Sequence, residues 1–165
     1  MKMIFRMPFI ILIALGLIIT MCSCGPSDLE IYMFSDLSEC RAIGSEELEG
    51  VQVTLYDSPA KDKYIKDLLY ADYYACNYSS ADLQFDLFAY EFPDQATAQV
   101  YFKNATGKDT TQTATFSISQ GLMTYRRIVI SNNLAYSVRT QVSDADAVIE
   151  IINQIFSEKI IAVEW

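Results

Sequence analysis

LYADYYACNYSSADLQFDLFAYEF, residues 69–92, is the stretch that decides the fold. Its two halves, 69–78 and 83–92, are rich in tyrosine and phenylalanine and are joined by Ser-Ser-Ala-Asp. Aromatic runs of this length on either side of a short polar turn are typical of two antiparallel strands. Toward the end of the second half, apolar residues fall on both faces of the expected strand, so we expect both faces to be covered there.

Strand and helix patterns continue on the C-terminal side of this hairpin. Residues 93–107 predict a helix that ends at Gly107. A meander of three strands follows, over 114–119, 123–131 and 134–142, with Asn132 and Asn133 as the second turn. A wide apolar stripe predicts a last helix over 144–156, and we expect the apolar tail 160–165 to dock on the body.

The N-terminal side of the hairpin allows two interpretations. Residues 27–30 form a capping box, and apolar residues then recur at helical spacing to Cys40, which predicts a helix. The alternative is a strand over 29–34, where apolar residues alternate. Further along, residues 51–55 predict a strand and Pro59 opens a short helix that runs to about Lys66.

These patterns predict an α+β fold with an antiparallel sheet of five or six strands and helices packed mainly on one face. A hydrophobic content of 52% with 13% aromatic residues excludes a disordered chain. Leaving out residues 1–23 reduces the 165 residues to 142, the size of one domain.

Residues 1–25, MKMIFRMPFIILIALGLIITMCSCG, have the pattern of a signal peptide. Lys2 and Arg6 precede an apolar run that is too short to span a bilayer. The ending resembles the lipobox of bacterial lipoprotein precursors, in which an apolar residue and a small residue stand at −3 and −1 before a lipidated cysteine. Met21 and Ser23 take those positions, so the resemblance implies that Cys24 is lipidated. Cys22 is the alternative, but it places bulky Met21 at −1.

The resemblance implies a signal peptide at 1–23, a lipidated cysteine and short tether at 24–27, and one extracytoplasmic domain at 28–165. It also implies a location on the outer face of the bacterial cytoplasmic membrane or in the cell envelope. The formal charge of −9 becomes −11 without Lys2 and Arg6. This charge argues against nucleic acid as a partner and against a polybasic grip on the membrane, so attachment depends on the N-terminal lipid.

The order of elements looks like that of small, uncharacterised lipoproteins of Gram-positive bacteria. Two stretches carry this resemblance: FAYEFPDQATAQVYF at 88–102 and YRRIVISNNLAYSV at 125–138. It covers about residues 51–156 in outline and implies no activity.

The chain has no histidine, which removes the commonest general base and the commonest metal ligand. Ser-His-Asp and Cys-His sites and zinc sites with histidine ligands are therefore excluded. Asp86 and Glu91 would point to opposite faces of one strand, which defeats a shared acid–base site. We expect no enzyme, no catalytic residues, no metal and no cofactor.

Cys40 and Cys76 form either one disulfide or two buried thiols.

Two sets of residues are candidates for binding. The first is an aromatic groove on the hairpin, made of Tyr74, Tyr78, Phe88, Tyr90 and Phe92. The alternative, which we favour, is that these rings pack beneath the helices. The second candidate is an anion contact at Arg126 and Arg139.

The turn at Asn132 decides whether Arg126 and Arg139 meet. A two-residue turn places them directly opposite each other, and two like charges then need an acidic neighbour or a bound anion. A three-residue turn centred on Asn132 sets Ile128 against Tyr136 and groups the apolar side chains better. We favour this second register, with the arginines in ordinary surface ion pairs.

The function we expect is a non-catalytic binding or accessory domain for an unknown protein, peptide or small ligand. The alternative is a purely structural or assembly-supporting envelope lipoprotein without a small-molecule site. A filled interface between the hairpin aromatics and the helices would favour the structural role.

Overall fold

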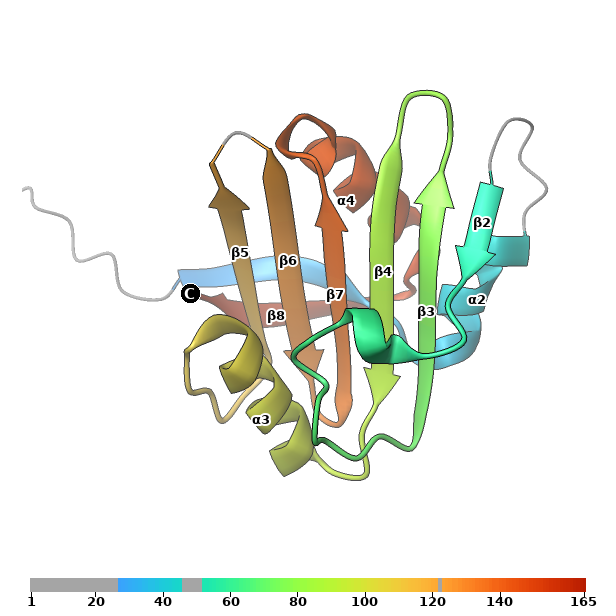
Figure 1. The fold of residues 1–165 in the computed structure, drawn as a ribbon. Coiled ribbons are helices and arrows are strands. Elements are labelled where there is room, and N and C mark those ends of the chain that lie inside the picture. Colours follow the sequence, from blue (N-terminus) through green and yellow to red (C-terminus); the bar gives the residue numbers. More distant parts are fainter. Residues whose placement is uncertain (1–26, 46–51, 122) are drawn as a thin grey trace, which may run out of the picture.

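The computed structural model describes residues 27–45, 52–121 and 123–165 (Figure 1). In this part of the chain, eight strands form one mixed, mostly antiparallel sheet in the order β1-β8-β5-β6-β7-β4-β3-β2. The strands are β1 (Ser27–Met33), β2 (Gln52–Leu55), β3 (Asp72–Ser79), β4 (Gln84–Glu91), β5 (Ala114–Gln120), β6 (Thr124–Ser131), β7 (Leu134–Thr140) and β8 (Glu158–Glu164). The helices are α2 (Leu37–Ser45), α3 (Gln95–Thr106) and α4 (Ala145–Ile155), with short 3-10 turns η1 (Pro59–Lys61) and η2 (Val142–Asp144).

The prediction of an α+β fold is confirmed, but the count of five or six strands is wrong because both ends of the domain are strands. β1 and β8 pair antiparallel over their whole length, and β8 joins β5 through a short parallel contact. The helix expected after Ser27 is therefore absent and the alternative strand is present, beginning at Ser27 itself. Leu29 and Met33 fit both periods, whereas buried Ile31 between them fits only the alternation of a strand.

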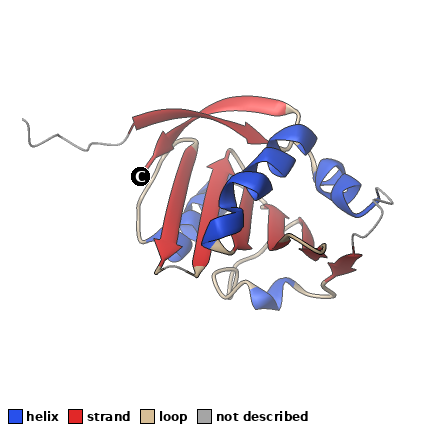
Figure 2. Ribbon diagram, turned by 90° about the horizontal axis from the view of Figure 1, so that it is seen from above, coloured by secondary structure: helices blue, strands red, loops and turns tan. Residues whose placement is uncertain are grey.

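The helices pack on both faces of the sheet, which corrects the expectation that they lie mainly on one. Figure 2 shows α2 and α4 on one side of the strands and η1 on the other. The first side buries a cluster that includes Phe34, Leu87 and Phe156, and the second buries a cluster that includes Tyr90 and Tyr101. Because both faces are covered, apolar side chains are needed on both sides of the central strands.

Helix α3 lies over the second face and its ends are set by local sequence. The Asp94 carboxylate accepts a hydrogen bond from the backbone N–H of Thr97 at 2.7 Å, which caps the first turn. Gly107 ends the helix with a φ of 74°, in the left-handed region that glycine adopts without a steric cost. Tyr101 and Phe102 then point into the core. The helix covers only one end of the face, and the other end carries polar residues.

The turn between β6 and β7 has two residues, Asn132 and Asn133. Asn132 has a φ of 53°, which asparagine tolerates better than most residues. Asn133 exchanges hydrogen bonds with the end of the hairpin: its carbonyl accepts from Phe92 N–H at 2.8 Å and its side-chain amide donates to the Phe92 carbonyl at 3.1 Å. These contacts fix the position of the turn against β4.

As a result Arg126 lies directly opposite Arg139, so the register that we favoured from the sequence is wrong. Ile128 pairs with Ser137 and not with Tyr136. The preference assumed that apolar side chains of two isolated strands should gather on one face. In the folded sheet Ile128 is buried on one face and Tyr136 on the other, so that assumption fails.

Candidate functional site

Four polar residues form one row across the central strands. Asn77 on β3 is opposite Asp86 on β4, Asp86 is opposite Arg139 on β7, and Arg139 is opposite Arg126 on β6. Residues directly opposite each other share a face of the sheet. The four residues lie on the face of the sheet against which α3 packs. Along β4, Asp86 comes two residues before buried Phe88, which lies on the same face. The polar row therefore begins where the apolar cover ends.

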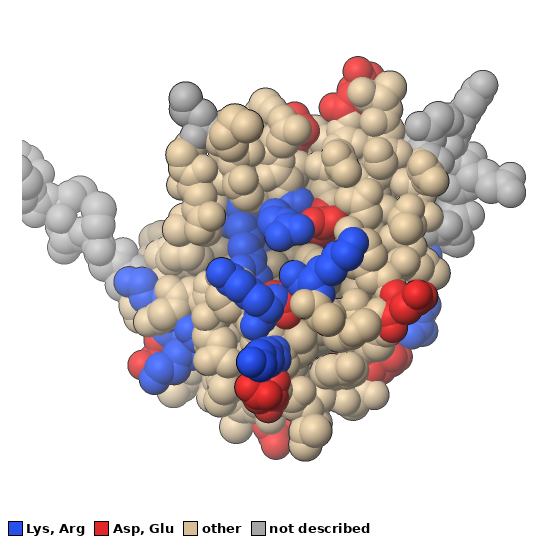
Figure 3. Space-filling view, viewed as in Figure 1, with Lys and Arg blue, Asp and Glu red and all other residues tan. Residues whose placement is uncertain are grey.

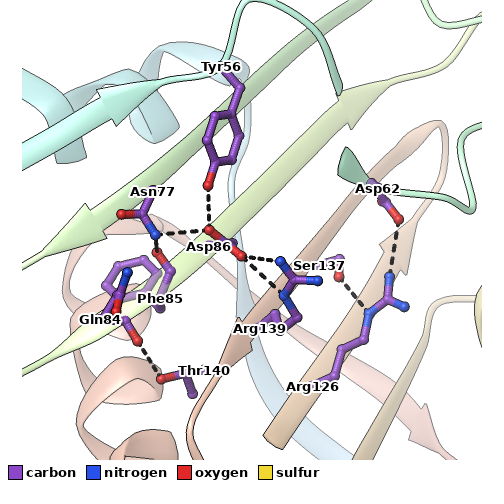
Figure 4. A network of polar contacts seen from close by, with 10 residues as sticks. All are labelled: Tyr56, Asp62, Asn77, Gln84, Phe85, Asp86, Arg126, Ser137, Arg139 and Thr140. Carbon is purple, nitrogen blue, oxygen red and sulfur yellow. Dashed lines mark hydrogen bonds and ion pairs between the residues drawn. The ribbon is translucent and has the colours of Figure 1, made fainter. Parts of the chain in front are cut away.

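Asp86 is the acidic partner that the arginine pair requires. Its carboxylate accepts two hydrogen bonds from Arg139, at 3.1 Å from Nε and 2.5 Å from a terminal nitrogen (Figure 4). Asn77 and the Tyr56 hydroxyl donate to its other oxygen, at 2.9 and 2.6 Å. Burial by itself raises the pKa of Asp86, but these hydrogen bonds outweigh it and hold the pKa below its usual value. Arg139 is therefore held by a charged carboxylate near neutral pH.

A second carboxylate reaches the row from the connection between β2 and β3, residues 57–71, which we call the strap. Figure 1 shows the strap crossing in front of the sheet. Asp62 in the strap has a side chain only 2% exposed. One of its oxygens accepts from the hydroxyls of Tyr101 on α3, at 2.6 Å, and Tyr90 on β4, at 3.2 Å. Asp62 thus fastens the strap to both the helix and the sheet.

The other Asp62 oxygen lies 3.4 Å from a terminal nitrogen of Arg126. The Arg126 Nε donates to the hydroxyl of buried Ser137 at 3.0 Å, and its guanidinium stacks over the ring of Tyr64 at 4.1 Å. Each arginine of the opposed pair therefore has its own carboxylate: Arg139 has Asp86 within the row, and Arg126 has Asp62 from the strap. This arrangement allows two like charges to stand opposite each other without a bound anion.

The strap and the row enclose a hollow of about 180 Å³, which we call the basic hollow. The strap supplies Lys61, Asp62, Lys63 and Tyr64, and the strands supply Phe88, Arg126, Ser137 and Arg139. Figure 3 shows Lys and Arg side chains gathered around a depression over the centre of the sheet, a local excess in a protein with a net charge of −9.

The two strap lysines that line the hollow, Lys61 and Lys63, are exposed and form no ion pair with any carboxylate that the structure describes. Lys61 Nζ instead lies 3.8 Å from the centre of the Tyr56 ring, and Lys63 Nζ lies 4.9 Å from that of Tyr64. A cation over a ring keeps most of its charge available to a further partner. The basic hollow can therefore attract an anion, whereas Asp62 in its lining and Asp86 beside Arg139 already have partners.

No protein-family model, curated protein or solved structure matches this chain. The assignment of the candidate site is therefore based on the geometry of the structure alone.

The aromatic groove predicted on the hairpin is not formed. Tyr74 and Tyr78 pack in the cluster beneath α2 and α4, while Phe88, Tyr90 and Phe92 pack on the opposite face of the sheet. All five side chains are at most 6% exposed. The alternative of core packing is the correct one, and only Phe88 also lines the basic hollow.

A larger depression of about 490 Å³ lies along the edge formed by β2 and β3. Its lining is mostly apolar, with exposed Leu55 and with Tyr73 and Tyr74. Arg41 is the one charged residue that the structure describes in this lining, and it is paired with Asp72 at 3.0 Å. We place the candidate site at the basic hollow, because it alone of these two depressions combines unpaired charge with fixed hydrogen-bond donors.

Cys40 and Cys76 are free thiols in the structure, so the disulfide that the sequence allows is not formed. Cys40 on α2 and Cys76 on β3 belong to the same buried cluster. Burial raises the pKa of Cys76 to about 11 and that of Cys40 further. Because the thiolate is the reactive form, we expect neither thiol of the native protein to react readily with a thiol reagent at neutral pH.

Thiol titration of a Cys22→Ala/Cys24→Ala variant, in which Cys40 and Cys76 are the remaining cysteines, checks this expectation. After unfolding without reductant, this protein should expose two reactive thiols that were protected before unfolding. No reactive thiol after unfolding would show instead that Cys40 and Cys76 are bonded.

Some predictions fall on other parts of the chain. The signal peptide and Cys24 lie outside the described residues, so lipidation stays a prediction. No helix among 27–45, 52–121 and 123–165 is long and apolar enough to cross a membrane. The same residues contain no group of three or more Cys, Asp or Glu side chains arranged to hold a metal ion.

Sequence reasoning found Arg126 and Arg139, but it did not connect Asp86 with them and it missed the strap residues Lys61, Asp62 and Lys63. In the sequence these residues read Lys-Asp-Lys, directly after the start of a short helix. This pattern is common on protein surfaces and does not indicate a site. Sixty-four residues separate Asp62 from Arg126, so no local period connects them.

Proposed function

We propose that this protein is a lipid-anchored, non-catalytic binding domain on the outer face of the bacterial cytoplasmic membrane, and that it binds an anionic ligand in the basic hollow. The observation that carries the proposal is the opposed pair Arg126 and Arg139 at the rim of an enclosed hollow. Each guanidinium is oriented by its own carboxylate, and two unpaired lysines stand beside them.

The contacts that surround the arginines support a binding role. Arg126 is held by Asp62, Ser137 and the ring of Tyr64, and Arg139 is held by Asp86. A guanidinium fixed in this way loses little conformational freedom when a ligand binds, which favours affinity. The side chains of Lys61 and Lys63 are exposed, and each carries its ammonium group on a flexible four-carbon stem. These ammonium groups can therefore move toward the negative charge of a bound ligand.

The structural or assembly-supporting role has one observation in its favour. The five hairpin aromatics expected to line a groove are buried, so in the part of the chain that the structure describes they pack in the core and do not form that groove. Under this alternative the polar row serves only to fasten the strap to the sheet, and the basic hollow has no ligand.

Thermal unfolding of the full chain in a non-ionic detergent distinguishes the two roles. The candidate ligands added in this experiment are dicarboxylates, phosphate esters and acidic peptides, all at constant ionic strength. A ligand that binds only the native state at a hundred times its dissociation constant stabilises that state by about 2.7 kcal/mol. For a domain of this size we expect the melting temperature to rise by several degrees with at least one anion.

The variant Lys61→Ala/Lys63→Ala should lose this rise, because it removes the unpaired cations and leaves both arginine–carboxylate pairs intact. The control Lys103→Ala/Lys108→Ala changes the net charge equally at the end of α3 and should retain the rise. If no anion stabilises the wild type more than the first variant, the binding role is wrong and the structural role is favoured.

A further inference from the structure

We infer that the basic hollow binds one compact, doubly charged oxyanion of the phosphate or sulfate type. This inference rests on the proposed function, since it names the ligand class of the same site. It is carried by the charge of the hollow, by the free donors of the two arginines and by the size of the hollow.

The charge of the hollow matches a dianion. Four cations contribute to it, namely Lys61, Lys63, Arg126 and Arg139, and two carboxylates compensate half of them. Two positive charges remain. A monoanion would leave one of them unneutralised, whereas a polyanion would bring excess negative charge against Asp62 and Asp86. A ligand with two negative charges is therefore the best electrostatic complement.

The donors of the two arginines are divided between protein and ligand. A guanidinium has five N–H donors. Arg126 uses its Nε and one terminal nitrogen on Ser137 and Asp62, and Arg139 uses its Nε and one terminal nitrogen on Asp86. Among the described residues, the remaining terminal nitrogen of each arginine has no hydrogen-bond acceptor. In Figure 4 the free nitrogen of Arg139 points away from Asp86 and toward the Ser137 side of the row.

These free donors come from directly opposed positions, where neighbouring strands hold side chains about 5 Å apart at Cβ. A small group that presents several oxygens can accept from both guanidinium groups at once. A tetrahedral oxyanion presents oxygens in several directions, so it can accept from two donors without one fixed orientation.

The size of the hollow agrees with a compact ligand. A volume of about 180 Å³ equals that of roughly six water molecules in the liquid. This is enough for one tetrahedral oxyanion with part of its hydration shell. Tyr64 and Phe88 add aromatic rings to the lining.

The phosphate chemistry has two sources for a protein held at a membrane. One is a free ion or a small soluble ester, and the other is the phosphomonoester headgroup of a lipid. Both present the same doubly charged group above about pH 7. The experiment therefore includes one arm for each source.

Isothermal titration calorimetry of the full chain in a non-ionic detergent, at about pH 8 and constant ionic strength, tests the inference. The probes are sulfate, inorganic phosphate, acetate and chloride, and a separate arm uses phosphatidylcholine vesicles with and without phosphatidic acid. We expect sulfate and phosphate to bind with a stoichiometry of one and with dissociation constants about tenfold or more below those of acetate and chloride.

The same pair of variants provides the controls. Lys61→Ala/Lys63→Ala should weaken dianion binding about tenfold or more, while Lys103→Ala/Lys108→Ala should leave it unchanged. Binding to phosphatidic acid vesicles but not to free dianions, abolished by the first variant alone, would support the same chemistry and assign it to a lipid.

Three results would overturn the inference. The first is equal binding of monoanions and dianions, the second is an equal loss in both double variants, and the third is no binding in either arm. The melting experiment keeps these failures apart from a failure of the proposed function, because a larger or singly charged anion that stabilises the wild type would preserve the function while excluding a compact dianion.

Discussion

Replacing Asp62 with alanine is expected to lower the free energy of unfolding by about 3 to 5 kcal/mol, the range for removing one partner of a buried ion pair. The substitution leaves Arg126 without its carboxylate. It also leaves the hydroxyls of Tyr90 and Tyr101, both fully buried, without the acceptor that they share. For a domain whose total stability is about 5 to 15 kcal/mol, this loss is a large fraction. Urea unfolding followed by circular dichroism measures it.

The matched control is Asp109→Ala. Asp109 pairs with Lys103 at 2.8 Å, but its side chain is 79% exposed, so its removal should cost about 0.5 kcal/mol or less. Asp62→Asn keeps one acceptor oxygen and should fall between the two. A loss below about 1 kcal/mol for Asp62→Ala would show that the strap is not fastened to the sheet by this carboxylate.

Replacing Cys24 with alanine is expected to abolish lipid attachment entirely. Two acyl chains on this residue would supply enough buried CH₂ groups for stable anchoring, where one chain is marginal. Without the cysteine the precursor should also remain unprocessed. Metabolic labelling with radioactive palmitate, together with the mass of the purified protein, measures both effects.

Cys22→Ala provides the control for the anchor, because it changes the neighbouring cysteine and leaves the lipobox-like spacing of Met21, Ser23 and Cys24 intact. This variant should incorporate label and be processed as the wild type is. Label that persists in Cys24→Ala, or that is lost in Cys22→Ala, would show that the modified cysteine has been misassigned.

The central strands could be predicted because their signals are local. Alternating apolar residues and short turns define the hairpin β3–β4 and the meander β5–β7, and Asp94 and Gly107 mark the ends of α3. The pairing of β1 with β8 has no such signal, since Ser27 meets Glu164 across almost the whole domain. The strand count was therefore too low.

The site was predicted in part. Arg126 and Arg139 were recognised as residues that need an acidic partner if they meet, and the structure supplies one partner for each. The register was wrong because two strands were compared without their neighbours. Asp86 on β4 makes the opposed pair favourable, and Asn133 is held by Phe92. Asp62 reaches the site from an irregular segment, whose path depends on packing and not on a period.

The central claim is that an anion binds between the two opposed arginines, and the NMR signals of the arginine Nε–H groups during a sulfate titration test it most directly. Arg41 and Arg127 serve as internal references, because Arg41 pairs with Asp72 at the sheet edge and Arg127 lies on the other face beside Thr115. We predict that the signals of Arg126 and Arg139 shift together and saturate with one dissociation constant, while those of the reference arginines stay in place. Signals that shift equally for all of these arginines, or that never saturate, would contradict the account.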